Sequence, residues 1–167
     1  MSLKTREILS FYKSKLEEIT PKIGRIHSTL RASAKPEDVI TDFKFKDASG
    51  RKELKFYILK PGPRTAERST IGGSKGCYLD LRTIVIQCFI SMATENPDAA
   101  DARLEDVVDK IVDKLFSIDR LSEKSGDNTF SPGNVAVTPI VVGKVSNTSV
   151  LIQEITTIVG DRRIPGG

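Results

Sequence analysis

Apolar positions along the chain repeat at two spacings, one typical of amphipathic helices and the other of strands. A helix is predicted from about Thr5 to Thr20, because apolar residues recur there every three or four positions: Ile8, Tyr12, Leu16 and Ile19. A second helix is predicted to begin at Pro97, after an Asn96 N-cap, and to end near Ile118. Its apolar stripe comprises Leu104, Val107, Val108, Ile111, Val112, Leu115 and Phe116. Each helix therefore has one face to bury.

Alternation of apolar and polar residues predicts six strands, at 23–30, 39–46, 53–60, 78–91, 134–145 and 149–160. The second and third strands flank an Asp/Ser/Gly turn, and the last two flank Ser146-Asn147-Thr148, so each pair predicts a β-hairpin. Pro139 interrupts one strand of the last hairpin, which predicts a sheet edge or a bulge. The strand at 78–91 becomes apolar on both faces in its second half, which is typical of a central strand.

Proline, glycine and polar residues gather in two stretches that predict long loops, at 61–76 and 119–133. Residues 161–167 are predicted to form a loose tail. The chain of 167 residues is expected to be one domain, with a structured core over about 5–160. The order of elements predicts an α+β fold, with an antiparallel or mixed sheet of about four to six strands and two main helices packed on one face.

Composition supports a globular domain but names no function. Hydrophobic residues make up 38% of the chain and charged residues 29%, which argues against global disorder. No apolar run approaches the roughly 18 residues of a membrane-spanning helix, and the N-terminus has no apolar signal-peptide segment. We therefore expect no membrane partner.

Charge is distributed unevenly between the two halves of the chain. Residues 1–75 hold 17 lysines and arginines against 9 aspartates and glutamates, a net charge of +8. Residues 76–167 hold 9 against 13, a net charge of −4. Such a molecule can bind nucleic acid through its basic half, or can bind copies of itself with basic face against acidic face. The basic residues are scattered singly, which favours a solvated surface or a protein interface over nucleic acid.

Cysteine and histidine offer little for catalysis or metal binding. Cys77 and Cys88 lie eleven residues apart on one predicted strand, too far apart for a disulfide, so both are expected to be free thiols in a reducing compartment. His27 is the single histidine, which disfavours a histidine-based metal site or a catalytic triad.

Two further motifs are also read as structural. The stretch Ile71-Gly72-Gly73-Ser74-Lys75-Gly76 lacks the order of a Walker loop and precedes a strand instead of a helix. Four acids at the start of the second helix are typical of helix capping and dipole interactions: Asp98, Asp101, Glu105 and Asp106. We expect no enzyme activity, no metal and no cofactor.

The whole pattern resembles the tail terminator, or minor tail, proteins of long-tailed bacteriophages and prophages, over residues 5–160. The resemblance lies in element order and in three stretches: 78–90 (YLDLRTIVIQCFI), 96–101 (NPDAAD), which opens the acidic helix, and 151–159 (LIQEITTIV). It implies a structural protein that assembles as a hexameric ring, caps the tail tube and joins it to the head connector. The implied partners are further copies of the chain, the tail-tube protein and a head-completion protein. The implied location is the bacterial cytoplasm during assembly and then the virion tail.

A closed ring needs an interface between two different patches, which the uneven charge can supply. We hypothesise that an acidic helix face (Glu105, Asp106, Asp109, Asp113) contacts basic residues of a neighbouring copy (Arg64, Arg68, Lys75). The alternative is that these acids are only a solvated helix face. A head–tail connector or neck component and a small nucleic-acid-binding α+β domain are the alternative functions.

Overall fold

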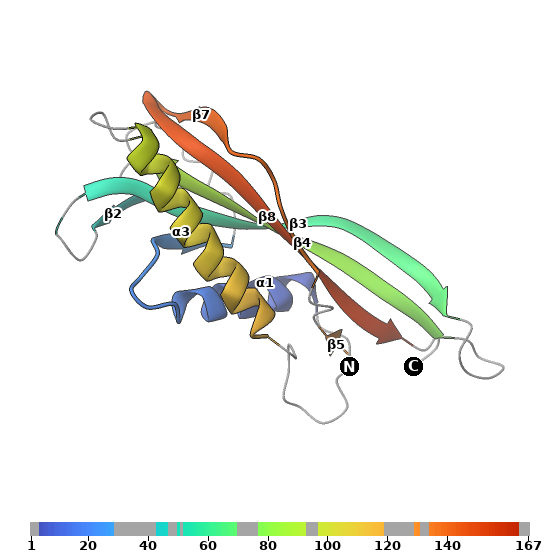
Figure 1. The fold of residues 1–167 in the computed structure, drawn as a ribbon. Coiled ribbons are helices and arrows are strands. Elements are labelled where there is room, and N and C mark those ends of the chain that lie inside the picture. Colours follow the sequence, from blue (N-terminus) through green and yellow to red (C-terminus); the bar gives the residue numbers. More distant parts are fainter. Residues whose placement is uncertain are drawn as a thin grey trace.

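The computed structural model describes residues 4–28, 43–46, 50, 52–69, 77–92, 97–118, 129–130 and 134–163. In these residues it has two helices, α1 (Thr5–Glu17) and α3 (Pro97–Phe116). The strands are β1 (Arg25–His27), β2 (Lys44–Lys46), β3 (Lys52–Ser69), β4 (Cys77–Ser91), β5 (Thr129–Phe130), β6 (Val135–Val137), β7 (Val141–Val145) and β8 (Thr148–Arg163). Figure 1 shows a single sheet that is crossed by both helices.

The sheet is built on three long antiparallel strands in the order β3, β4, β8. On one side, β1 and β2 pair with successive parts of β3, and the β1 pairing is parallel, so the sheet is mixed. On the other side, β7, β6 and β5 pair with successive parts of β8. Eight strands therefore occupy only five positions across the sheet, because the short strands share edges. This confirms the predicted α+β fold.

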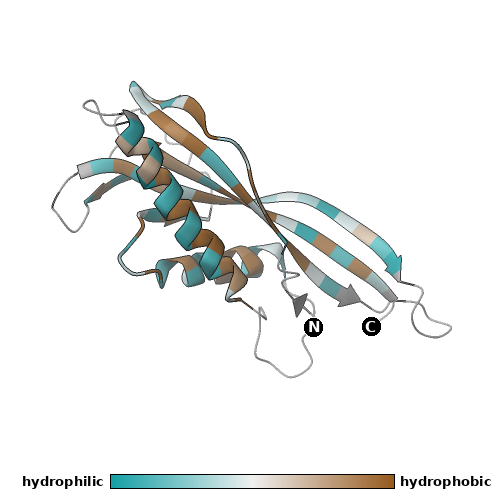
Figure 2. Ribbon diagram, in the orientation of Figure 1, coloured by the Kyte–Doolittle hydropathy of each residue, from teal (hydrophilic) through white to brown (hydrophobic). Residues whose placement is uncertain are grey.

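Both helices pack on the same face of the sheet, as predicted. That face is formed by the even-numbered residues of β4 and their β8 partners, with Ile84, Ile86 and Ile90 fully buried against α1 and α3. The opposite face carries a smaller aromatic cluster in which Phe43, Phe56 and Phe89 stack at centroid distances of 4.2 and 4.5 Å. Figure 2 shows apolar and polar residues alternating around α3, which is the pattern that orients it.

The helix boundaries follow the sequence signals. α1 ends at Glu17, three residues before the predicted end at Thr20, because Pro21 and Gly24 disfavour continuation of the helix. The Glu7 carboxylate accepts the Lys4 backbone N–H and caps the first turn. α3 begins at Pro97 as predicted and ends two residues before Ile118, whereas the predicted N-cap lies outside the described residues.

The predicted loop at 61–76 is wrong over residues 61–69, which continue β3 as an ordered strand. The Pro61-Gly62-Pro63 segment is accommodated by a bulge, since Pro61 pairs with Ile84 and Arg64 pairs with Arg82. A proline is tolerated here because β1 and β2 pair only with the part of β3 up to residue 58, so the described residues provide no second neighbour that needs an N–H at this point. Residues 70–76 lie outside the described residues.

Two other boundary predictions also need correction. The predicted loose tail is wrong at 161–163, which form the end of β8 and pair with residues 78–80 of β4. Within the predicted loop at 119–133, residues 129–130 form β5, and the other residues lie outside the described part of the chain. The predicted strand at 39–46 is described only from residue 43, and residues 44–46 form β2.

The ends of the long strands form an arm, which we define as residues 64–69, 77–82 and 159–163. Figure 1 shows these ends of β3, β4 and β8 extending beyond both helices. The pairing stays continuous along the arm, from Thr65↔Leu81 to Ser69↔Cys77 on one side and from Arg82↔Val159 to Tyr78↔Arg163 on the other. The molecule therefore has a helix-covered core and a projecting arm of three long strands, with the short β5 paired to β8 at its base.

Candidate assembly interface

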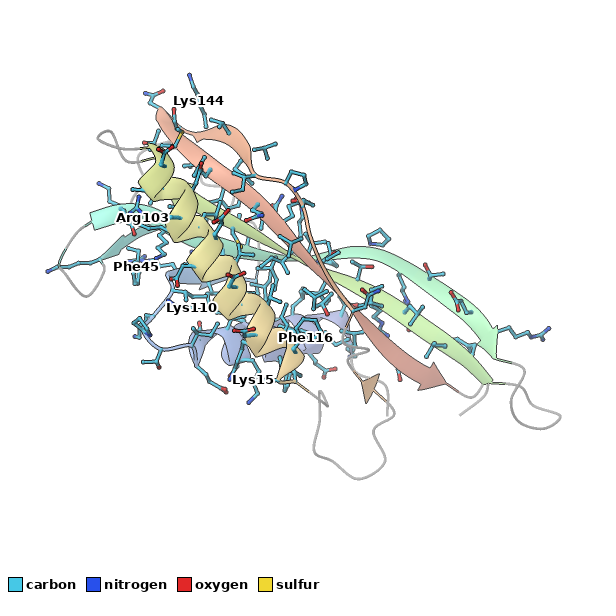
Figure 3. All side chains as sticks on the ribbon, in the orientation of Figure 1. Lys15, Phe45, Arg103, Lys110, Phe116 and Lys144 are labelled. Carbon is cyan, nitrogen blue, oxygen red and sulfur yellow. The ribbon has the colours of Figure 1, made fainter. Side chains whose placement is uncertain are left out.

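The outward face of α3 is an acidic stripe, which we define as Asp98, Asp101, Glu105, Asp106, Asp109 and Asp113. All six side chains are exposed. They recur every three or four residues, so the stripe extends roughly 22 Å at a rise of about 1.5 Å per residue. Phe116 continues it at the C-terminal end of α3 with 56% of its surface exposed (Figure 3). The structure thus places all four acids of the predicted interface, Glu105, Asp106, Asp109 and Asp113, on one exposed surface.

The basic residues of α3 lie beside the stripe and contact the chain's own carboxylates. Arg103 donates to the Glu53 carboxylate of β3, and the Lys114 ammonium lies 2.8 Å from a Glu18 oxygen at the end of α1. The bonds from Lys114, then Lys15, lower the pKa of Glu18. These two contacts fix the helix to its neighbours, whereas the third basic residue, Lys110, lies 2.6 Å from Asp106 and compensates one acid of the stripe. The outward face keeps an excess of negative charge, because α3 holds six acids against three basic residues.

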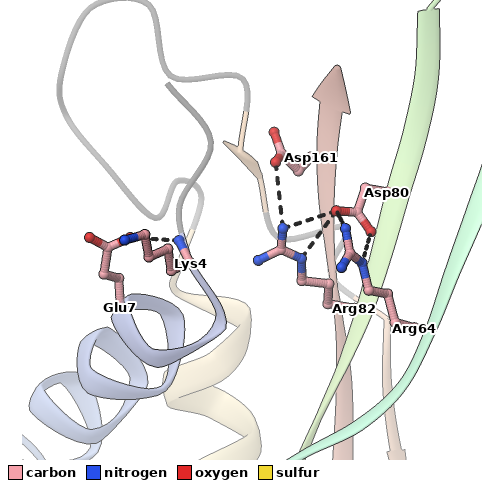
Figure 4. Close-up of polar contacts among 6 residues, drawn as sticks. All are labelled: Lys4, Glu7, Arg64, Asp80, Arg82 and Asp161. Atoms are coloured by element: carbon pink, nitrogen blue, oxygen red, sulfur yellow. Dashed lines mark hydrogen bonds and ion pairs between the residues drawn. The ribbon is translucent and has the colours of Figure 1, made fainter. Parts of the chain in front are cut away.

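Four ionised side chains meet at the base of the arm, on the face that the helices cover (Figure 4). Arg64 binds Asp80 through two hydrogen bonds, from Nε to Oδ1 at 2.6 Å and from an Nη atom to Oδ2 at 2.8 Å. Arg82 also donates to Oδ2 of Asp80, at 2.9 and 3.2 Å, and its guanidinium lies 4.0 Å from Asp161. We call these four residues the ion quartet.

Burial distinguishes the members of the ion quartet. Asp80 is fully buried, and Arg82 and Asp161 are 5% and 3% exposed, whereas the Arg64 side chain is 56% exposed. Burial by itself raises the pKa of Asp80, but the hydrogen bonds from Arg64 and Arg82 outweigh it and leave the pKa below its ordinary value. Asp80 is therefore a carboxylate held between two guanidinium groups.

The bulge in β3 determines that Arg64 takes part in the ion quartet. Before the bulge, odd-numbered residues such as Leu59 face the helices, whereas beyond it Arg64 and Ala66 share that face with Arg82 and Asp80. One extra residue in β3 therefore exchanges the two faces of the strand. Sequence alternation already placed Asp80 and Arg82 on the same side as Ile84. An i, i+2 pair of opposite charges on the side of Ile84 is therefore the sequence signal from which a buried ion pair could be predicted.

Two of the three predicted basic partners of the stripe, Arg64 and Arg68, lie on the arm. Arg64 is engaged by Asp80 of its own chain, Arg68 is exposed near the end of β3, and Lys75 lies outside the described residues. Figure 1 shows the arm directed away from α3, so Arg68 and the acidic stripe do not meet within one chain. Contact between them would require two copies.

A third surface lies on the edge strands β6 and β7. Val137, Val141 and Val142 are 44%, 57% and 69% exposed, and with Phe116 they are the large apolar side chains that stand exposed in the described part of the chain. The sequence predicted this edge from Pro139, which falls between β6 and β7. Exposed apolar residues on a sheet edge are typical of an association surface.

The described residues show no arrangement typical of a catalytic or metal centre. No group of three or more histidine, cysteine or acidic side chains is placed to hold a metal ion there. His27 packs edge-on against the Phe43 ring at 4.9 Å, and burial raises the pKa of the Cys88 thiol. Neither described helix is long and apolar enough to cross a membrane.

Comparisons with known proteins add little to these surfaces. No protein-family model matches the chain, and no curated protein matches it. Among solved structures, 22 chains match. In one of them, a protein of no stated function, the similarity covers 98% of this chain and 99% of that chain, with 10% sequence identity and a TM-score of 0.49. Similarity at this level carries no argument about function, so the proposal below depends on the surfaces themselves.

Proposed function

We propose that the chain is a structural protein of phage or prophage tail assembly with the role of a tail terminator. In this proposal a ring of six copies caps the tail tube and presents a surface to the head-completion protein. The protein acts by binding, first in the bacterial cytoplasm and then in the virion tail. A head–tail connector or neck component would use the same surfaces between copies and would differ in its partner.

The separation of the acidic stripe from the arm is the observation that carries the proposal. α3 holds six acids against three basic residues, and the arm holds five arginines against three carboxylates. Arg103 and Lys114, which could neutralise the stripe, instead bind carboxylates of β3 and α1. Two patches of opposite charge on different parts of one molecule suit a heterologous interface, which is the kind that generates closed rings.

Nucleic-acid binding has weaker support from the same structure. The basic half of the sequence places Lys55, Lys60 and Arg64 on β3, and each lies within 4.0 Å of a carboxylate of its own chain. Their charges are partly compensated, so they do not form a continuous basic track for phosphates. Lys44 and Lys46 on β2 and Arg68 on β3 are exposed, but β2 pairs with the start of β3, whereas Arg68 lies at its far end.

Solution mass measured by light scattering on a sizing column, at low and high salt, tests the ring. The expected species at low salt is six times 18.4 kDa, or about 110 kDa, with six-fold rings in negative-stain electron micrographs. Asp113→Lys should shift the mass towards smaller species, whereas Glu17→Lys, the same charge change on the exposed side of α1, should not. Equal effects of the two variants would contradict a role for the acidic stripe.

Tube capping tests the role itself. Tail-tube protein from the same phage or prophage should stop elongating when the purified chain is added, and the chain should be found at one end of each tube. Binding only to isolated head-completion protein would favour the neck alternative. A salt-dependent shift with generic duplex DNA, without any effect on tubes, would favour the nucleic-acid alternative.

A further inference from the structure

The sheet has two open edges on opposite sides. In the described part of the chain, β7 pairs with β8 and has no strand on its other side. Beyond residue 58, β3 pairs with β4, and the described residues place no strand on its outer side because β1 and β2 pair only with residues 52–58. Each open edge presents backbone N–H and C=O groups that a further strand could bind.

The edge at β6 and β7 is largely apolar, and its protective residues are Pro139, which lies between the two strands, and Lys144 near the end of β7. No charged residue occurs between Val135 and Gly143. Val141 and Val142 are adjacent and therefore point to opposite faces of the sheet, yet both are more than half exposed. Solvation of one face cannot explain both valines. An added strand that lies alongside β7 would cover part of each.

The open β3 edge of the arm matches the β7 edge in length, and its side chains are small enough to pair with it. β7 has five residues, and the outer part of β3 from Arg64 to Ser69 has six. Thr65 and Ala66 are exposed, small and central in this segment, so they leave room for valine side chains from a neighbouring strand. Arg64, Glu67 and Arg68 flank them with charges that would disfavour non-specific pairing.

We propose that β7 of one copy adds to the open β3 edge of the arm of the next copy, so that the sheets join head to tail. The occupant of each edge is a second copy of this chain. Pairing of β7 with another β7 would stop at a dimer and leave both arms open, whereas head-to-tail pairing uses both edges and can close a ring. This inference rests on the proposed function and identifies an interface within it.

Mixing of two variants, each with one introduced cysteine, tests the pairing. In a Cys77→Ser background, Val142→Cys and Thr65→Cys are purified separately under reducing conditions, combined and oxidised with copper phenanthroline. Cys88 stays in place because it is fully buried. A disulfide-linked dimer is expected from the mixture and not from either variant alone. The matched control replaces Thr65→Cys with Ser14→Cys, on the exposed side of α1, and should give no dimer.

Dimers from Val142→Cys alone would overturn the inference in favour of β7–β7 pairing. An oligomer of wild-type mass without crosslinks in the mixture would overturn it while leaving the ring intact. A wild-type chain that stays monomeric at the highest attainable concentration would exclude a second copy as the occupant, and tube capping would then test the function separately.

A substitution provides the second measurement. Val142→Lys places a charge on the β7 edge. Because the Val142 side chain is 69% exposed, the variant should keep the fold, and its circular dichroism spectrum should match that of the wild type. Its oligomer should be lost, whereas Ser14→Lys should assemble as the wild type does. Normal assembly of Val142→Lys would overturn the inference.

Discussion

Replacing Asp80 with alanine should destabilise the protein far more than replacing Arg64, although the two side chains bind each other. Asp80 is fully buried, and without it the guanidinium of Arg82, itself 5% exposed, loses the carboxylate that lies 2.9 Å away. Removing one partner of a buried ion pair costs about 3–5 kcal/mol, because the other charge is left buried and uncompensated. Asp80→Ala is therefore expected to lower the free energy of unfolding by about 3–5 kcal/mol.

Arg64→Ala removes a side chain that is 56% exposed and leaves Asp80 bound by Arg82. Its expected cost is about 1 kcal/mol, as for ion pairs that solvent reaches. Urea denaturation followed by circular dichroism measures both costs, provided that the slope m is unchanged. As a control, Asp80→Leu combined with Arg82→Met and Asp161→Asn should recover much of the loss, because the three buried charges of the ion quartet are removed together. Equal costs for Asp80→Ala and Arg64→Ala would refute the assignment of the buried interaction to Arg82.

Three other changes test the core and the charge state of the ion quartet. Tyr57→Phe should cost about 1–3 kcal/mol in urea denaturation, because the buried Tyr57 hydroxyl donates to the Ile23 carbonyl at 2.7 Å and the carbonyl would lose its partner. Gly24→Ala should cost about 1–3 kcal/mol by the same assay, because a Cβ would lie 2.7 Å from the Lys55 carbonyl oxygen and from a ring carbon of Tyr57. The lowered pKa of Asp80 stabilises the fold above the unfolded value of about 4, and this contribution is lost as pH falls through the lower folded pKa. The urea midpoint of Asp80→Asn should therefore depend less on pH between about 5 and 2 than that of the wild type, and equal dependence would contradict the assignment.

The helices and the last hairpin were predictable because their information is local. The stripe around Leu16 and the stripe around Ile111 each specify one buried face, and those faces meet the sheet as expected. Pro139 marked the break between β6 and β7, because a proline has no N–H to donate to a neighbouring strand, whatever its position in the sheet. These signals need only neighbouring residues in the sequence.

The arm was missed because its strands are stabilised by partners distant in the sequence. Residues 61–69 contain Pro61 and Pro63 and little apolar surface, so local reasoning predicts a loop. Their order comes from β4, and residues 161–163 are ordered by the same strand from its other side. Tertiary pairing overrode local propensity in both segments.

The candidate interface was predictable in part. The spacing of Glu105, Asp109 and Asp113 places them on the outside of α3, and the structure confirms their exposure. The contact of Arg64 with Asp80 of its own chain could not be predicted from the sequence. The face that Arg64 occupies depends on the bulge, and a bulge leaves no periodic signal. The contact between acidic stripe and arm stays a prediction.

The number of residues in the bulge next to Gly62 decides which face of the sheet each side chain from Arg64 to Ser69 occupies. The surface of the arm therefore depends on this number as much as on which residues the arm contains. Gly62 packs so closely on Thr83 and Val85 that a Cβ there would lie 3.1 Å from each. Deleting one residue at this point would keep every side chain of β3 from Arg64 to Ser69 but exchange the two faces of this segment, turning Arg64 away from Asp80. Homologous chains that differ by a single-residue insertion or deletion here would therefore present opposite surfaces to a common partner. Alignments of such chains should be judged first by the number of residues between Lys60 and Arg64, and only then by which residues they are.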